Sequence, residues 1–346
     1  MSEPLRVGIA GYGVVGKRRR QVVDARADMR TVAVCDRVLG GEGTFEDGIR
    51  YYATYQRLLE AETLDVLFVC LTNDLNPDAT IAGLEAGMHV FCEKPPGRDV
   101  GDVRRVIACH GRHPERALKY GFNHRYHDSV RDALALVRGG ELGEVINLRG
   151  VYGKSKLITF EQTTWRTERA LAGGGVLLDQ GIHMVDLLRL FAAEEFTDVH
   201  SFVSNTVWNH EVEDNAYALM RTPLGRVAML HSSASQWRHR FHLEIALTRG
   251  AVTLAGILSG SKSYGAETLT VAWAAESDQG DPREQTTRYT ADPSWTDEVA
   301  DFADAIRTGR PVADGSADEA LRTMQLVYRI YCADAEWKTA WDLIDA

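Results

Sequence analysis

Short apolar runs alternate with helix-like stretches through about residue 120 of the chain. These runs lie at 7–10, 31–35, 66–70, 89–92 and 117–120. A helical pattern fills 78–86, and Gly87 supplies its stop signal. The alternation predicts a parallel sheet with right-handed helical crossovers.

The pattern changes after about residue 144, where long runs of β-branched and aromatic residues follow one another. We expect strands at 145–152, 199–208, 215–221, 226–234, 241–248 and 268–273. Strands in succession without helices between them predict a largely antiparallel sheet. Helices are expected at 129–138, 175–191, 296–307 and 317–337, and a surface loop at 276–282.

These two patterns predict an α/β protein with two domains. At 346 residues, the chain exceeds the size at which one hydrophobic core usually keeps growing. We expect a doubly wound α/β domain at 1–122. An α+β domain with an open, mostly antiparallel sheet is expected at 123–346.

The first apolar run ends in a GxGxxG turn formed by Gly11, Gly13 and Gly16. Gly11 permits the tight strand-to-helix turn, Gly13 leaves room for a pyrophosphate, and Gly16 lets the helix pack on the strand. The N–H groups that begin the helix, at Val14 and Val15, favour a negative ligand. The turn predicts a dinucleotide site and so a Rossmann dinucleotide-binding domain at 1–122, although three glycines can also form a turn that binds nothing.

The second apolar run is followed by Asp36, 20 residues after Gly16. An acid at this spacing binds the ribose 2′-hydroxyl of NAD and repels the 2′-phosphate of NADP. Arg37 could instead pair with that phosphate. We therefore expect NAD as the cofactor, with NADP as the alternative.

Glu93 and Lys94 come directly after the fourth apolar run. Ligands of doubly wound folds lie outside the carboxyl ends of the strands, so both residues are expected at the nicotinamide. Pro95 restricts the backbone of Lys94, which is consistent with a positioned side chain. The alternative is an ordinary surface charge.

Asp179 and His183 are four residues apart in the expected helix at 175–191 and share one of its faces. An acid and an imidazole on one face suit hydrogen bonding to sugar hydroxyls and proton transfer. Asp186 is spaced to fix the tautomer of His183. The alternatives are a purely structural pair and a metal site, for which no further ligand occurs at the usual short spacing.

A tryptophan and an arginine just before the glycines at 173–175 form one further pair of expected substrate contacts, Trp165 and Arg166. Trp208 and Trp237 fit a core or an interface better than a sugar platform. The chain has no GxSxG elbow of a serine hydrolase.

The composition argues against several classes of protein. The formal net charge is -10, whereas nucleic-acid-binding surfaces are basic. The one basic run, at 17–20, fits a solvated helix face better than a phosphate contact. Five cysteines without a CxxC pair argue against a disulfide framework or a zinc site. No signal peptide or apolar run of ~18 residues is seen, so we expect a cytoplasmic protein.

The order of these motifs resembles the Gfo/Idh/MocA family, the relatives of glucose-fructose oxidoreductase and inositol dehydrogenase, over essentially the whole chain. The resemblance rests on the glycine turn, Asp36, the segment 84–95, Trp165 with Arg166, and the segment 173–183. By resemblance, Lys94 is the catalytic lysine, and Asp179 and His183 complete the site. The resemblance also implies that the domain at 123–346 serves substrate binding and oligomerisation, with an open sheet that often makes oligomer contacts.

The chain departs from the family after its third expected strand. The family commonly has Thr-Pro-Asn and then a histidine, whereas this chain has Leu71, Thr72 and Asn73, and then Asn76. The first three remain expected neighbours of the cofactor, while the role of the histidine is left open.

Two other segments, 120–127 and 150–154, look similar to members from surface-polysaccharide and nucleotide-sugar pathways. They add Asn123 and Arg125 to the expected substrate contacts.

The combined motifs predict an NAD(P)-dependent oxidoreductase acting on a secondary hydroxyl or ketone of a sugar, cyclitol or nucleotide-linked sugar. Hydride transfer would be assisted by Lys94 and His183 as acid and base. The alternatives are an NAD-retaining glycosidase or lyase that uses transient oxidation, and a non-catalytic redox sensor. No metal, nucleic acid or membrane is expected as a partner. A homodimer or homotetramer is expected, because few helices remain to cover both faces of the second sheet.

Overall fold

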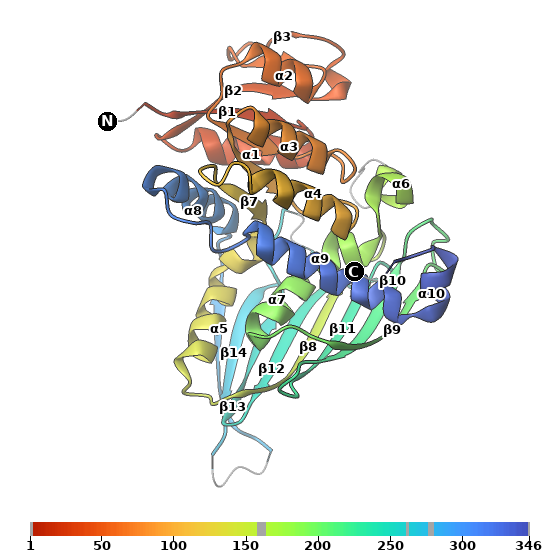
Figure 1. Ribbon diagram of the computed structural model, residues 1–346. Coiled ribbons are helices and arrows are strands. Elements are labelled where there is room, and N and C mark those ends of the chain that lie inside the picture. Colours follow the sequence, from red (N-terminus) through yellow and green to blue (C-terminus); the bar gives the residue numbers. More distant parts are fainter. Residues whose placement is uncertain (1–2, 158–163, 261–262, 276–279, 345–346) are drawn as a thin grey trace. The chain divides into compact units, whose positions relative to one another are not determined.

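The computed structural model describes residues 3–157, 164–260, 263–275 and 280–344 (Figure 1). The chain divides into two compact units: the first unit is 1–122 with 295–321, and the second unit is 123–294 with 322–346. The segment 295–321, which the sequence patterns assign to the second domain, thus belongs to the first unit.

The first unit is built on a sheet of seven strands. In spatial order they are β3 Gly43–Thr44, β4 Arg50–Tyr52, β2 Met29–Cys35, β1 Leu5–Ala10, β5 Val66–Val69, β6 His89–Glu93 and β7 Leu118–Gly121. Neighbouring strands are parallel except for β3 and β4. The five expected strands and the Rossmann architecture are confirmed. The strand order reverses at β1, which is where doubly wound sheets bind ligands.

Helices cover this sheet because its central strands are apolar on both faces; every residue of β5 is buried. The helices are α1 Val14–Asp24, α2 Tyr55–Ala61, α3 Asn76–Glu85, α4 Val100–His110 and α8 Ser294–Thr308. From α8, Phe302 meets the edges of Phe68 and Phe91 at centroid distances of 6.2 and 5.6 Å. A helix from the far end of the sequence therefore completes the core of the first unit.

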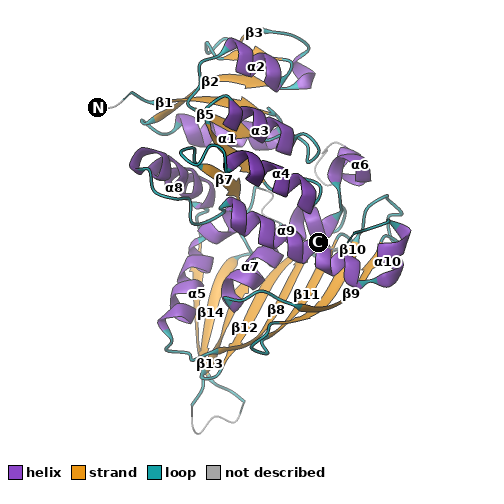
Figure 2. Cartoon of the chain, viewed as in Figure 1, coloured by secondary structure: helices purple, strands orange, loops and turns teal. Residues whose placement is uncertain are grey.

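The second unit is built on a sheet of eight strands (Figure 2). In spatial order they are β15 Arg283–Tyr289, β14 Glu267–Trp273, β13 Gly250–Ala255, β12 Arg240–Leu247, β8 Val145–Gly153, β11 Val227–Ser233, β10 Asn215–Arg221 and β9 Asp198–Ser204. All neighbours are antiparallel except β8 and β11. The mostly antiparallel sheet is confirmed, with β13 and β15 as strands that the patterns missed. The expected loop at 276–282 lies partly outside the described residues.

The remaining helices are α5 Asp128–Gly139, α6 Arg169–Ala172, α7 Ile182–Ala192, α9 Ala317–Ala333 and α10 Ala335–Ala340. All belong to the second unit except the first turn of α9, which belongs to the first. Helix α7 contacts β8 and β11, and α5 contacts β13 and β14. Gly150 on β8 permits close packing of α7, because a Cβ there would lie 2.7 Å from Met184 Cγ.

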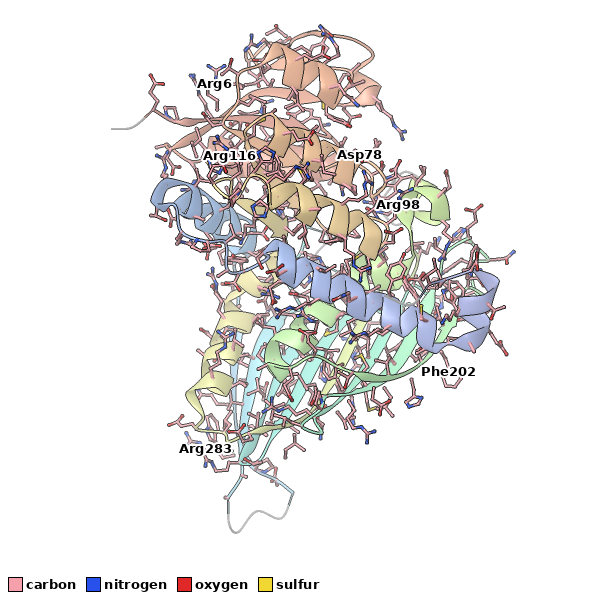
Figure 3. The ribbon with its side chains drawn as sticks, viewed as in Figure 1. Arg6, Asp78, Arg98, Arg116, Phe202 and Arg283 are labelled. Carbon is pink, nitrogen blue, oxygen red and sulfur yellow. The ribbon has the colours of Figure 1, made fainter. Side chains whose placement is uncertain are left out.

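The opposite face of the sheet exposes apolar side chains. Phe202 on β9 is 78% exposed (Figure 3) and pairs in register with Tyr217 on β10. Leu219 and Met229, also paired in register, are 50% and 48% exposed. This apolar face, defined by these four residues, is what a sheet leaves uncovered when its helices lie on one side.

Candidate active site

The glycine turn joins β1 to α1 and has one open position. Gly11 has φ +91°, and a Cβ on it would lie 2.2 Å from the carbonyl oxygen of Cys70. A Cβ on Gly16 would lie 1.9 Å from the carbonyl oxygen of Gly11. A Cβ on Gly13, by contrast, would meet no atom within 4 Å. The fold itself requires Gly11 and Gly16, whereas the space at Gly13 is free for a ligand that lies against the backbone.

Two matched substitutions separate these roles. Gly13→Ala should preserve the thermal stability of the protein but weaken NAD binding, because its methyl group fills the space of the pyrophosphate. Gly16→Ala should instead lower the stability, because the backbone at Gly11 has to move. Calorimetric titration with NAD and thermal unfolding of both variants measure this difference. Equal NAD affinity of Gly13→Ala and the wild type would contradict the assignment.

Asp36 lies beside the glycine turn, as its spacing predicts. Its Oδ2 accepts a hydrogen bond from the Tyr12 N–H at 2.8 Å, and its Oδ1 accepts one from the Val38 N–H at 3.1 Å. These bonds fix the carboxylate while leaving lone pairs for a ribose hydroxyl. Arg37, next to it, is exposed at the start of the short 3-10 helix η1 Arg37–Leu39.

The loop after β5 is tied to the loop after β6 by a buried amide. Asn76 Oδ1 accepts from the Leu71 N–H at 3.1 Å, and Asn76 Nδ2 donates to the Pro95 carbonyl at 3.3 Å. Thr72 is half-buried and Asn73 is buried in the same loop. Asn76 thus bridges the loop that contains Asn73 and the segment that follows Lys94, a role the sequence patterns did not reveal.

Lys94 follows the last residue of β6, and the peptide bond between Lys94 and Pro95 is cis. The preceding Glu93 is buried, and its Oε1 lies 2.6 Å from Arg19 Nε. The carboxylate of Glu93 therefore holds the strand end that carries Lys94. Its expected contact with the cofactor stays a prediction.

The interpretation of the basic run at 17–20 as a solvated helix face is wrong for Arg19. Its side chain is fully buried, and Nη2 lies 2.7 Å from Oε2 of Glu298 on α8. The guanidinium lies over the rings of Phe91 and Trp295, at 4.4 and 4.2 Å. Two carboxylates compensate the buried charge, which the local sequence around Arg19 does not indicate.

Glu298 should make the stability of the protein depend on pH. Burial raises the pKa of its carboxyl to about 7, although Arg19 acts to lower it. A carboxyl with a raised pKa in the folded state takes up protons on folding, so its contribution to stability falls as pH rises from about 4.5 to about 7. Glu298→Gln should lose less stability than the wild type between pH 5 and 8 in urea unfolding. An equal loss of stability in Glu298→Gln and in the wild type over this pH range would contradict the assignment.

In the second unit, Asp179 lies in a π-helical turn, η4 Leu177–Gly181, rather than in the α-helix expected from 175. Glu213 supports this turn: its two carboxylate oxygens accept from the N–H groups of Gly175 and Leu177 at 2.6 and 2.9 Å. The hydroxyl of Tyr331 donates to the same carboxylate at 2.7 Å. Burial raises the pKa of Glu213. The sequence patterns gave no sign of this buried support.

Asp179 faces two cations. Lys154 Nζ lies 3.3 Å from Oδ2, and Arg166 Nε lies 3.5 Å from Oδ1. The Arg166 guanidinium also lies 4.5 Å above the ring of Trp165. The structure thus brings together three residues singled out from the sequence, Asp179, Arg166 and Trp165, and adds Lys154.

His183, on the first turn of α7, stacks on His124 with ring centroids 3.7 Å apart. His124 Nε2 shares a hydrogen bond with the Tyr152 hydroxyl at 3.0 Å, and Nδ1 lies 3.3 Å from Asn123 Oδ1. Burial raises the pKa of Tyr152 well above its ordinary value, so its hydroxyl stays protonated. The hydrogen bond from Tyr152 holds His124, and the stacked ring of His124 in turn holds the ring of His183.

Arg125 forms a buried ion pair with Asp186, with both contacts at 2.7 Å. The hydroxyl of Thr323 donates to the same carboxylate at 3.2 Å. The expectation that Asp186 fixes the tautomer of His183 stays a prediction. Asn123 Nδ2 donates to Ser294 Oγ at 3.0 Å. Substrate contacts by Arg125 and Asn123 stay predictions.

Some features bear on alternative chemistry. All five cysteines are free thiols. Among the described residues, no group of three or more His, Cys, Asp or Glu side chains is arranged to hold a metal ion. Within the same residues, no helix is both long and apolar enough to cross a membrane.

Comparisons with known proteins agree with this geometry. The family model "Oxidoreductase family, NAD-binding Rossmann fold" matches residues 5–121, and "GFO/IDH/MocA C-terminal domain" matches residues 130–253. A D-glucoside 3-dehydrogenase of Escherichia coli K12 is 33% identical over 210 residues, which is 58% of each chain. The match thus spans less than two thirds of that relative.

Two further proteins are similar over more of their length. A dTDP-3,4-didehydro-2,6-dideoxy-alpha-D-glucose 3-reductase of Saccharopolyspora spinosa is 30% identical over 66% of this chain and 68% of its own. The crystal structure of an aldose-aldose oxidoreductase from Caulobacter crescentus is 26% identical, with a TM-score of 0.80 over 96% of this chain and 98% of that one.

Proposed function

Because the chain belongs to the Gfo/Idh/MocA family of oxidoreductases, we propose that it oxidises a secondary hydroxyl of a sugar, or reduces the matching ketone, with NAD. One arrangement carries the proposal. The strands β1, β2, β5 and β6 are parallel, so the open space at Gly13, the carboxylate of Asp36, the loop with Asn73, and Lys94 all follow strand ends at one edge of the sheet.

The residues of the first unit fit NAD in a specific way. The N–H groups of Val14 and Val15 begin α1, which has no side-chain cap, and they suit the pyrophosphate. Asp36 suits the ribose hydroxyls, and its charge disfavours the extra phosphate of NADP. NAD, when bound, supplies the hydride acceptor or donor.

Lys94, Asp179 and His183 are proposed to manage the proton of the reacting hydroxyl. During oxidation the hydroxyl oxygen loses a proton as its carbon loses a hydride, and an amine or imidazole can accept that proton. Asp179 is proposed to orient the hydroxyl, since Lys154 and Arg166 beside it stabilise its charged form.

Two relatives are named for a reaction at carbon 3 of a sugar. This supports a secondary hydroxyl of a sugar ring as the reacting group. The same names, a dehydrogenase and a reductase, favour net oxidation or reduction over the NAD-retaining glycosidase. A non-catalytic sensor would have no need of Lys94, Asp179 and His183. Free thiols at all five cysteines suit the reducing cytoplasm.

A turnover screen tests the proposal. The protein is mixed with NAD or NADP and with free sugars, glycosides, cyclitols, uronic acids and nucleotide sugars, and reduced cofactor is measured. We expect turnover with at least one sugar class and a preference for NAD. The absence of turnover in both directions across the panel would refute the function, and equal or tighter binding of NADPH than of NADH would refute the assigned role of Asp36.

The apolar face of the second unit is proposed to join copies of the chain into a dimer or tetramer. Its paired residues Phe202, Tyr217, Leu219 and Met229 form a patch that a symmetric partner can cover with the same residues. Leu219→Asp should therefore shift the protein to monomers in sedimentation velocity, because each interface would bury two carboxylates. A wild type that sediments as a monomer at micromolar concentration would refute the proposal.

A further inference from the structure

A cluster of charges in the second unit joins the end of β8, the short 3-10 helix η3 Thr164–Thr167 and the turn η4. Lys154 and Arg166 lie 3.3 and 3.5 Å from the two carboxylate oxygens of Asp179. The Lys154 side chain is only 8% exposed, and those of Arg166 and Asp179 are 21% and 20% exposed. One carboxylate therefore faces two cations in a largely dehydrated place.

Two buried arginines in this protein, Arg125 and Arg19, are balanced differently. Arg125 and Asp186 meet one to one, with two contacts of 2.7 Å. Arg19 has two carboxylates, at 2.6 and 2.7 Å. At Asp179, one carboxylate instead faces two cations. Both contacts exceed the ~2.7–2.9 Å of a well-formed charge-assisted hydrogen bond. Among the described residues, the cluster therefore has one positive charge in excess.

Within the part of the chain that the structure describes, the polar groups beside the cluster do not supply a second negative charge. Burial and the positive charge of Lys154 lower the pKa of His239. Its ring nitrogens lie 2.8 and 3.1 Å from the hydroxyls of Ser263 and Ser155. Burial raises the pKa of Tyr264, whose hydroxyl accepts from Gln180 Nε2 at 2.9 Å. At neutral pH these groups are uncharged hydrogen-bonding partners of the kind that sugar hydroxyls need.

From this imbalance we propose that the second unit binds a sugar that carries a carboxylate or a phosphate group. The guanidinium of Arg166, stacked on Trp165, is the specificity-determining contact, because its planar set of donors matches either anion. Lys154 adds a second positive charge on the other carboxylate oxygen of Asp179. The inference rests on the proposed function and narrows its substrate class, with negative charge as the shared feature.

Matched sugars test this inference. Methyl β-D-glucoside, methyl β-D-glucuronide and glucose 1-phosphate differ in charge on a common ring, and the last two separate carboxylate from phosphate. Their binding to the NAD-loaded protein is measured by calorimetry at low and high salt, together with kcat/KM where turnover occurs. Arg166→Gln is the test variant, Lys154→Gln the second, and Arg169→Gln the control, because Arg169 lies over Trp341.

We expect at least one anionic sugar to bind more tightly than the glucoside and to weaken with salt. Arg166→Gln should weaken the binding of that anionic sugar by about 10- to 100-fold and the binding of the glucoside by far less. Arg169→Gln should change neither affinity. Tighter binding of the glucoside, or an equal loss for both sugars in Arg166→Gln, would overturn the inference and leave the proposed function standing. Anion-selective binding without any cofactor turnover would support the inference while refuting the proposed function.

Discussion

Replacing Lys94 by alanine is expected to lower the turnover number by roughly 100- to 10,000-fold while leaving NAD affinity nearly unchanged. Lys94 follows β6 at the carboxyl edge of the parallel sheet, and its neighbours are fixed on both sides. Glu93 is held by Arg19, and the Pro95 carbonyl accepts from Asn76. Loss of the amine would remove a proton acceptor without disturbing the glycine turn.

Steady-state rates and calorimetric NAD titration of Lys94→Ala measure this effect. Lys338→Ala, on α10, is the matched control and should behave like the wild type. Near-normal turnover of Lys94→Ala would make Lys94 a surface charge and remove it from the mechanism. A parallel loss of NAD affinity would instead assign it to cofactor binding.

His183→Asn is expected to lower the oxidation rate by roughly 100-fold or more and to flatten its dependence on pH. An imidazole can accept a proton only when neutral, so the wild-type rate should rise with pH as His183 loses its proton, and His183→Asn should lack this rise. Protonating both His183 and His124 is unfavourable, since their rings stack at 3.7 Å.

Profiles of kcat against pH for His183→Asn and the wild type test this role. Tyr152→Phe removes the hydroxyl that bonds His124, and it should shift the rising limb without abolishing it. His113→Asn, just after the end of α4, is the control. A rising limb that persists unchanged in His183→Asn would assign the titration to another group, with Lys94 as the first candidate.

The strands and the glycine turn could be predicted because their signals are local. Apolar runs marked five of the seven strands of the first sheet, and the glycine spacing placed Asp36 beside the turn. Missed strands lacked such a signal: β15 is exposed over nearly all its length, and β13 is a short run in a hairpin. Trp237, expected in a core or an interface, is 80% exposed in this chain.

Buried charge and helix distortion could not be predicted, because their causes lie far away in the sequence. Arg19 is buried because α8 brings Glu298 to it from 279 residues away. The π-helical turn at Asp179 is supported by Glu213, beyond the end of α7. The stacking of His183 on His124 likewise needed the tertiary structure, since 59 residues separate the two rings.

The stoichiometry of cofactor reduction tests the central claim most directly. The protein is incubated with NAD and a sugar that it converts, and NADH and all sugar products are quantified over several turnovers. The proposed hydride transfer predicts one NADH for each sugar oxidised, with the carbon skeleton and any glycosidic bond intact. Cleavage of the sugar with no accumulated NADH would contradict it and favour transient oxidation by a retained cofactor.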